Sequence, residues 1–165
     1  MSDKKCRWGI LGSAGIAQKN WQSIHHAENA ELVAVASRDV QKSQDFISRC
    51  RAQVPHVNKP EALGSYEELL ARDDIDAVYL PLPTGLRPEW AMKVAEAGKH
   101  LLCEKPCGTS LDQVEKIVSA CEQTGVQFMD GVMFMHSERL NKVREVIDDG
   151  STIGKLKRIN TQFSF

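Results

Sequence analysis

The sequence predicts an α/β protein built on a doubly wound parallel sheet, and two observations lead to this fold class. Short apolar runs typical of buried strands alternate with amphipathic runs typical of helices along most of the chain. The first apolar run, residues 7–11, passes through a glycine-rich turn directly into a helical segment. In such a sheet the ligand site lies at the carboxyl ends of the strands, where right-handed crossovers bring the loops together.

The turn after the first strand has the residue types that a bound pyrophosphate requires. Gly12 permits a tight turn, the small Ala14 lets the backbone approach a ligand, and small Ala17 lets the helix lie close to the sheet. The unpaired N–H groups and the dipole of the following helix favour an anion there. The spacing is that of G-x-G-x-x-G/A with Ala14 at the middle glycine, so a plain tight connection is the alternative interpretation.

A helix is expected over residues 16–27, followed by a buried strand of β-branched and small residues over 31–37. A second helix over 41–53 carries three side chains at helical spacing on its buried face: Phe46, Ile47 and Cys50. Prolines and a glycine make residues 54–64 the least regular stretch, with at most a short edge strand. Ser65 then caps a short helix that has acidic residues in its first turn.

Further strand and helix units follow in the second half of the chain. They are expected as strand 76–80 with helix 88–97, and strand 99–103 with helix 110–124. Residues 81–85, Pro-Leu-Pro-Thr-Gly, cannot form regular structure. Ser110 and Gln113 have the spacing of a capping box. A last strand of this sheet is expected over residues 126–129.

The end of the chain predicts elements that do not belong to this sheet. A helix is expected over residues 137–149, and residues 155–165 form a strand-like run. The alternating apolar positions of that run are Leu156, Ile159, Thr161, Phe163 and Phe165. A strand needs a sheet to pair with, so we expect residues 1–130 to form a dinucleotide-binding domain and 131–165 to be a linker helix and the first strand of a truncated α+β domain.

Composition and charge exclude several classes of function. The 165 residues are 42% hydrophobic and 26% charged, which is ordinary usage for one globular domain. A formal net charge of −1 gives no electrostatic basis for binding nucleic acid or an anionic membrane. No apolar run approaches the roughly 18 residues of a membrane span, and residues 1–7 are too polar for a signal peptide. We therefore expect a soluble cytoplasmic protein.

The five cysteines indicate neither a disulfide framework nor a zinc site, because their number is odd and paired C-x-x-C spacing is absent. Cys103 and Cys107 form the one close pair. We interpret them as reduced thiols on either side of a turn rather than as metal ligands. No metal is expected.

The end of the second strand predicts the choice of cofactor. In the dinucleotide fold an acidic residue at this point accepts from the 2′-hydroxyl of NAD. Here Ser37 and Arg38 stand at the strand end, and Lys42 lies one turn beyond. Arg38 and Lys42 suit the 2′-phosphate of NADP, because a guanidinium and an ammonium match a dianion. NAD stays open as the alternative, since Asp39 offers a carboxylate for a ribose hydroxyl.

Three segments together resemble the Gfo/Idh/MocA oxidoreductases. They are G-I-L-G-S-A-G-I-A at residues 9–17, S-R at 37–38, and A-G-K-H-L-L-C-E-K-P at 97–106, with Glu-Lys-Pro the most specific part. The run M-D-G-V-M-F-M-H and the closing F-S-F are similar to the subgroup of glucose-fructose oxidoreductase and dihydrodiol dehydrogenase. The resemblance implies a Rossmann NAD(P)-binding domain followed by an α+β substrate domain. It also implies hydride transfer between the nicotinamide and a sugar, a polyol or a related hydroxy or carbonyl compound.

The resemblance also implies a role for particular residues. It assigns Gly12, Ala14, Gly15 and Ile16 to the pyrophosphate, Ser37, Arg38 and Lys42 to the adenosine end, Leu82, Pro83 and Thr84 to the nicotinamide ribose, and Glu104 and Lys105 to the nicotinamide. Catalysis falls to Lys105, whose ammonium stabilises a developing alkoxide, and to Glu104, which orients Lys105 or contacts the cofactor. A cis peptide bond between Lys105 and Pro106 is implied as well.

Some residues depart from the pattern of that family. Thr84 stands where Asn is common, and Arg87 stands where His is common. Arg87 is interpreted as a surface residue of its helix, because most arginines are exposed, with recognition of an anionic substrate as the alternative. His136 is a candidate substrate contact near the domain junction, although a single histidine there is more often structural.

Two other classes of function remain to be weighed. The chain is alternatively a non-catalytic nucleotide-binding or scaffold domain. A methyltransferase that binds S-adenosylmethionine would usually keep an acidic residue where Ser37 and Arg38 stand. We expect an N-terminal fragment of a longer oxidoreductase that binds NADP without turnover and takes a small-molecule substrate. A homo-oligomer formed through the missing domain is left open.

Overall fold

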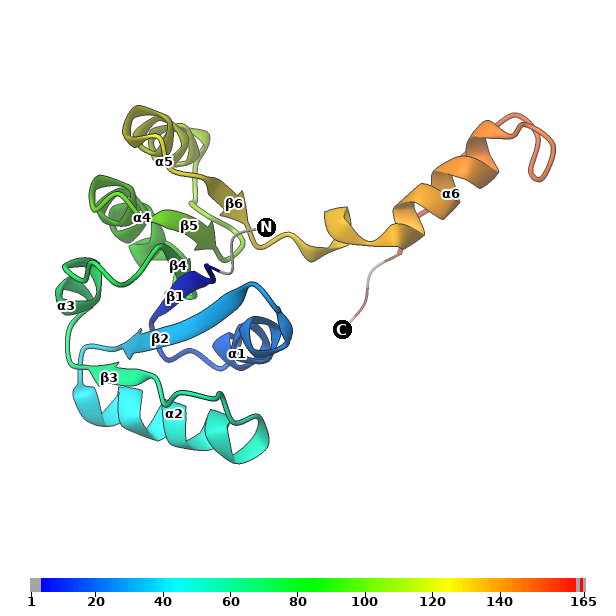
Figure 1. Cartoon of the computed structure of the whole chain (residues 1–165). Coiled ribbons are helices and arrows are strands. Elements are labelled where there is room, and N and C mark those ends of the chain that lie inside the picture. The colour runs from blue at the N-terminus through cyan, green and yellow to red at the C-terminus, as the bar shows by residue number, and fades with distance from the viewer. Residues whose placement is uncertain (1–3, 163, 165) are drawn as a thin grey trace. The chain divides into compact units, whose positions relative to one another are not determined.

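Residues 4–162 and 164 are described in the computed structural model of the chain, which divides into two units, Met1–Gly131 and Val132–Phe165 (Figure 1). The first unit holds a six-stranded sheet in the order β3-β2-β1-β4-β5-β6, and every pair of neighbouring strands is parallel. The strands are β1 (Cys6–Leu11), β2 (Ala30–Ala36), β3 (Glu61–Leu63), β4 (Ala77–Leu80), β5 (His100–Cys103) and β6 (Phe128–Asp130). The predicted doubly wound sheet is confirmed.

Helices cover both faces of this sheet. They are α1 (Ala17–His26), α2 (Val40–Gln53), α3 (Tyr66–Leu70), α4 (Arg87–Glu96) and α5 (Leu111–Thr124). In Figure 1, α1 and α2 lie beside the half of the sheet that holds β2 and β3, whereas α4 and α5 lie beside β4, β5 and β6. The strand order reverses between β1 and β4, and this reversal places the carboxyl ends of those two strands at the topological switch point.

Two hydrophobic cores form because successive side chains of a strand point to opposite faces. Ile10 and Tyr79 belong to a core with α1 and α2, whereas their neighbours Leu11 and Leu80 belong to a core with α3, α4 and α5. The predicted buried face of α2 is confirmed, since Phe46, Ile47 and Cys50 are all buried in the first of these cores.

Serine side chains fix the starts of two helices. The Ser65 hydroxyl accepts from the Glu68 N–H at 3.1 Å, and the Ser110 hydroxyl accepts from the Gln113 N–H at 3.4 Å. The predicted capping box is only half formed, however, because the Gln113 side chain does not return to the Ser110 N–H. Its Oε1 accepts instead from the backbone N–H of Thr109 at 2.8 Å and from the Thr109 hydroxyl at 3.1 Å. The two donors of Thr109 thus hold the Gln113 side chain in place of the single N–H of Ser110.

The connection from α2 to β3 is held by Trp21 of α1. Its indole N–H donates to the Val54 carbonyl at 2.8 Å, and the buried His56 ring donates through Nε2 to the Trp21 carbonyl at 3.1 Å. Burial lowers the pKa of His56. Strand β3 lies at the end of the strand order and pairs with β2, which confirms the predicted short edge strand.

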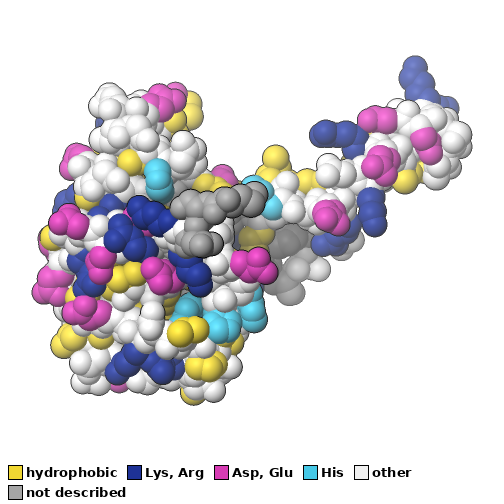
Figure 2. All heavy atoms as spheres, viewed as in Figure 1, with side chains coloured by type: hydrophobic (Ala, Val, Ile, Leu, Met, Phe, Trp, Pro, Cys, Tyr) yellow, Lys and Arg dark blue, Asp and Glu magenta, His cyan; other side chains and the backbone are white. Residues whose placement is uncertain are grey.

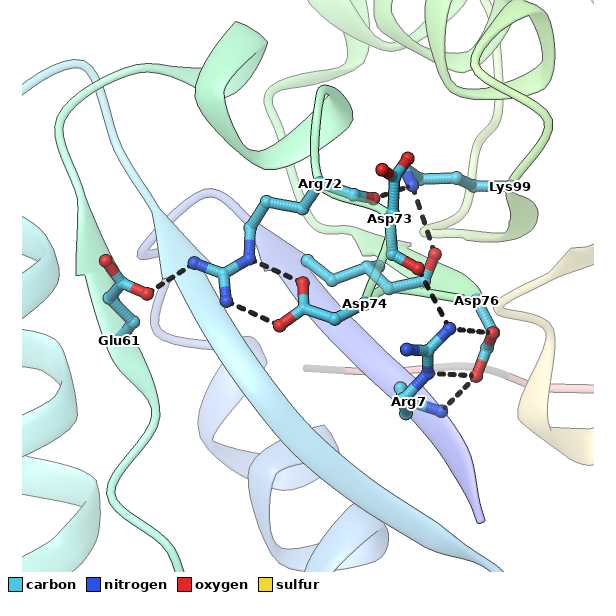
Figure 3. A network of polar contacts seen from close by, with 8 residues as sticks. Arg7, Glu61, Arg72, Asp73, Asp74, Asp76 and Lys99 are labelled. Carbon is cyan, nitrogen blue, oxygen red and sulfur yellow. Dashed lines mark hydrogen bonds and ion pairs between the residues drawn. The ribbon is translucent and has the colours of Figure 1, made fainter. Parts of the chain in front are cut away.

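A network of charged side chains joins the amino ends of the strands (Figure 3). Arg7 of β1 binds both carboxylate oxygens of Asp76, just before β4, at 2.9 and 2.7 Å. Arg72 binds both oxygens of Asp74 at 2.8 and 2.7 Å and also pairs with Glu61 of β3. The buried Lys99 donates to the carbonyls of residues 72 and 75 at 2.5 and 3.0 Å, and burial lowers its pKa. This edge lies opposite the carboxyl ends of the strands.

Among its described residues, the second unit contains a 3₁₀ turn, η2 (Met133–His136), and one helix, α6 (Glu138–Asp148). The helix confirms the prediction for residues 137–149. The predicted strand is wrong over residues 155–162, where the structure has no strand, and Phe163 and Phe165 lie outside the described residues. An alternating pattern makes a strand only when a neighbouring strand pairs with it. The expected start of a second α+β domain is therefore not evident.

The surface of the first unit carries mixed charge on the face seen in Figure 2, where basic and acidic side chains intermingle. A broad basic surface of the kind that binds nucleic acid is not seen on this face. Among residues 4–162 and 164, no helix is long and apolar enough to cross a membrane.

Candidate functional site

The turn that follows β1 brings two loops of the switch point into contact. Gly12 has a left-handed φ of +121°, and its N–H donates to the Ala36 carbonyl of β2 at 2.8 Å. A Cβ atom on Gly12 would lie only 2.8 Å from Cδ2 of Leu82, in the loop after β4. Glycine is therefore required here both by the backbone conformation and by the close approach of Leu82.

The start of α1 leaves donors and space at the same turn. Ala17 donates its N–H to the Ala14 carbonyl at 3.0 Å, whereas the backbone N–H groups of residues 13–16 have no partner in the described part of the chain. Ile16 is the N-cap and supplies no capping side chain. Gly15 is exposed, and nothing lies within 4 Å of the place where its Cβ would be. Such a turn suits an anion.

The end of β2 carries exposed basic side chains, as the sequence indicates. Arg38 and Lys42 are exposed, while Ser37 is buried and donates its N–H to the Leu63 carbonyl at 3.2 Å. Burial raises the pKa of Tyr66, and the charge of Arg38 acts in the opposite direction. The Asp39 carboxylate accepts from the Gln41 N–H at 2.9 Å and so caps α2.

The loop after β4 is more ordered than the sequence indicates. Leu82 is buried and Pro83 is exposed, but residues 84–86 form the 3₁₀ turn η1 (Thr84–Leu86), closed by the Leu86 N–H on the Pro83 carbonyl at 2.9 Å. The expectation of no regular structure over 81–85 is therefore wrong at Thr84 and Gly85. Pro83 fixes its own φ and leads the chain into this turn.

Arg87 is not the surface residue that its type suggests. Its side chain is only 8% exposed. Nε donates to the Leu82 carbonyl at 2.6 Å, and Nη1 donates to the Pro106 carbonyl at 2.7 Å and to the Thr84 hydroxyl at 3.2 Å. The guanidinium is buried because backbone carbonyls of two loops satisfy it there.

Glu104 and Lys105 follow β5 and have different environments. Glu104 is buried, and its carboxylate accepts from the Tyr79 hydroxyl at 2.8 Å and from the backbone N–H of Lys105 at 3.2 Å. Burial and the adjacent Glu104 raise the pKa of Tyr79. The Lys105 side chain is exposed, and its ammonium has no ion-pair or hydrogen-bond partner among the described residues. Glu104 thus contacts the backbone of Lys105, not its ammonium.

The peptide bond between Lys105 and Pro106 is cis, as the resemblance implies. Two buried thiols, Cys103 and Cys107, lie on either side of this segment, and the Cys103 thiol donates to the Glu104 carbonyl at 3.6 Å. The neighbouring Cys107 thiol and burial raise the pKa of Cys103. In the described part of the chain, no group of three or more His, Cys, Asp or Glu is placed to hold a metal ion.

Sequence reasoning missed two residues of this region, Tyr79 and Gly131, and wrongly placed Arg87 on the surface. A tyrosine inside a buried strand was the one available signal, since a buried hydroxyl needs a partner. Gly131 is needed for space, because a Cβ there would lie 3.2 Å from Oε2 of Glu104. His136 belongs to the second unit, and its side chain is exposed.

The fold and these loops define a class, the dinucleotide-binding α/β proteins with a glycine turn at the switch point of a 3-2-1-4-5-6 sheet. A model of the oxidoreductase family with an NAD-binding Rossmann fold, Gfo/Idh/MocA, matches residues 6–132. The chain belongs to this family.

Similar proteins include several dehydrogenases and reductases. A D-xylose 1-dehydrogenase (NADP(+)) of Haloferax volcanii is 37% identical over 96% of this chain and 46% of its own length. A trans-1,2-dihydrobenzene-1,2-diol dehydrogenase of Mus musculus is 30% identical, with 96% and 46% covered. A crystal structure of a 3-ketoreductase from Actinomadura kijaniata with NADP has a TM-score of 0.83 at 33% identity, with 92% and 46% covered. The chain spans about half the length of these relatives.

Proposed function

We propose that this chain binds NADP at the carboxyl ends of its strands and forms the cofactor-binding half of an oxidoreductase. The observation that carries the proposal is the left-handed turn at Gly12, packed on Leu82 at the switch point. Free N–H groups over residues 13–16 and open space beside Gly15 suit a pyrophosphate. Ala14 and Ile16 complete the turn that would hold the pyrophosphate.

NADP is favoured over NAD by the charges at the end of β2. Arg38 and Lys42 are both exposed, and their charges suit a 2′-phosphate beside Ser37. Asp39 is the one acidic residue at this point that would favour NAD, but its carboxylate caps α2. A carboxylate held by the Gln41 N–H is less available to a ribose hydroxyl.

Lys105 is the proposed catalytic residue, and Glu104 is proposed to position it. A bound nicotinamide would supply or accept the hydride, beside a ribose along Leu82, Pro83 and Thr84. The Lys105 ammonium is exposed and without an acidic partner in the described chain, so it is available to stabilise an alkoxide or to donate a proton to it. Glu104 fixes the backbone at Lys105 through its N–H and is itself fixed by Tyr79.

The proposed substrate is a sugar, a polyol or a related hydroxy or carbonyl compound. The names of the relatives support this class, since they include a xylose dehydrogenase and a 3-ketoreductase. We propose that turnover also needs residues from the part of the relatives that this chain does not span.

The cofactor proposal is tested by titration calorimetry of the 165-residue chain with NADP and NAD. NADP is expected to bind more tightly, and Arg38→Ala is expected to remove most of the difference, because a charge-assisted contact is worth about 1.5–3 kcal/mol. Arg49→Ala, an exposed arginine further along α2, is the matched control and should change neither affinity. Equal losses for both cofactors in Arg38→Ala would contradict this role.

Catalysis is tested on a chain extended at its carboxyl end, by following nicotinamide absorbance with sugars and polyols. We expect turnover that Lys105→Met abolishes, while NADP still binds. Binding of NADP without turnover in the extended chain would favour the scaffold alternative. Stabilisation by S-adenosylmethionine alone in a thermal shift would overturn the oxidoreductase proposal, since a ligand at 100 times its Kd stabilises by about 2.7 kcal/mol.

A further inference from the structure

Arg87 joins two loops that come from different strands. It lies at the start of α4, and its guanidinium binds the Leu82 carbonyl after β4 and the Pro106 carbonyl after β5, at 2.6 and 2.7 Å. The Thr84 hydroxyl is its third acceptor, at 3.2 Å. Leu82 and Thr84 are among the residues proposed to meet the nicotinamide ribose, and Pro106 directly follows Lys105. None of the three acceptors belongs to the residues proposed for the adenosine end.

The guanidinium is held by neutral acceptors rather than by an ion pair. Among the described residues, no carboxylate lies within 4.0 Å of Arg87. A buried charge is costly unless its donors are satisfied, so the position of the side chain depends on both loops being in place. A planar fork with donors in fixed directions can span two carbonyls, whereas a single ammonium on a flexible stem cannot reproduce that geometry.

We infer that Arg87 is a positioning residue that ties the loop carrying Lys105 to the loop of residues 82–84, and so sets the nicotinamide end of the site. This inference rests on the proposed function. Without the guanidinium, the loop of Lys105 and Pro106 loses its connection to Thr84. The Gly12 turn and Arg38 make no contact with this guanidinium, so their positions do not change. The affinity for the whole dinucleotide then falls, and the affinity for its adenosine end does not.

The experiment compares two ligands on variants of the 165-residue chain. NADP covers the whole site, and adenosine 2′,5′-bisphosphate covers only the adenosine end. Arg87→Met removes the fork, and Lys93→Met is the matched control, because it removes an exposed cation from the same helix. Arg87→Met is expected to weaken the binding of NADP about tenfold, as the loss of a charged hydrogen bond would. Its affinity for the bisphosphate should stay within about twofold of the wild-type affinity. Lys93→Met should bind both as the wild type does.

Arg87→Lys keeps the charge and most of the stem, so it serves where the methionine variant does not fold. It is expected to show the same selective loss of NADP affinity. NADP affinity equal to wild type in Arg87→Lys, or equal weakening of both ligands, would overturn the positioning role. Failure of the wild-type chain to bind either ligand would instead overturn the proposed function, and so the two failures are distinguishable.

Discussion

Two glycines of the first turn should respond very differently to an added methyl group. Gly12→Ala is expected to destabilise the protein by about 2 kcal/mol or more, because of its left-handed φ of +121° and its contact with Leu82. Gly15→Ala meets nothing within 4 Å, so it should change stability by less than about 0.5 kcal/mol. Gly15→Ala should still weaken the binding of NADP, because the added methyl group fills space that the pyrophosphate would occupy. Urea unfolding and NADP titration measure the two effects, and equal stability of both variants would contradict this reading.

A second prediction for a single residue concerns how His56 makes the stability of the fold depend on pH. Burial lowers the pKa of His56 below that of the unfolded chain, so protons bind the unfolded state more readily. The contribution of His56 to stability is therefore full above about pH 6.5 and is lost as the pH falls through the lower pKa of the folded state. His56→Gln keeps an N–H donor for the Trp21 carbonyl but does not titrate.

The measurement is the free energy of unfolding of both proteins between about pH 5 and pH 8. The difference between wild type and His56→Gln should shrink or reverse on acidification. The nearby His25 and Arg51 also lower the pKa of His56, so their effect on its charged form is part of the difference between the two proteins. A difference that does not vary with pH would contradict the prediction.

At the scale of elements, the Arg7–Asp76 pair joins the amino ends of β1 and β4 with two hydrogen bonds between side chains. The Arg7 guanidinium holds the pKa of Asp76 well below its usual range. Asp76→Asn is expected to cost about 1–2 kcal/mol of unfolding free energy, after allowance for partial exposure. Because the folded pKa is depressed, the stabilisation is present above about pH 4 and is lost as the pH falls below it.

The matched control is Glu89→Gln, which breaks an exposed pair with Lys93 on α4. Exposed pairs of this kind contribute about 0.3–0.5 kcal/mol. Denaturant unfolding at neutral pH should separate the two variants, and a loss in Asp76→Asn no larger than in Glu89→Gln would show that the bidentate geometry adds little.

Much of the arrangement of elements could be predicted from the sequence, because local patterns determine it. The alternation of apolar strands with amphipathic helices, the caps at Ser65 and Ser110, and the edge position of β3 all follow from neighbouring residues. Arg87 could not be predicted, because the carbonyls that bury it come from Leu82 and from the distant Pro106. The strand expected at the end of the chain was wrong over residues 155–162 for a related reason, since a strand depends on a partner.

At the scale of the whole molecule, burial is concentrated in the first unit. The buried apolar side chains lie between Ile10 and Cys121, and no described residue of the second unit is buried. On α6, Leu140, Val143 and Val146 remain exposed. The first unit therefore carries the stability of the fold and the proposed cofactor site, and the assignment of the second unit to a substrate domain stays a prediction.

The distribution of the cysteines allows the opening of the native fold to be followed by the rate at which each thiol is alkylated. Cys6 is half-buried, whereas Cys50, Cys103, Cys107 and Cys121 are buried and free. An alkylating reagent would label Cys6 first and reach the others only through fluctuations of the fold. Cys50 lies in the core under α1 and α2, and Cys121 lies in the opposite core. The labelling rates of Cys50 and Cys121 therefore report on the opening of the two cores separately. The labelling rate of Cys107 reports on the opening of the loop that carries Lys105.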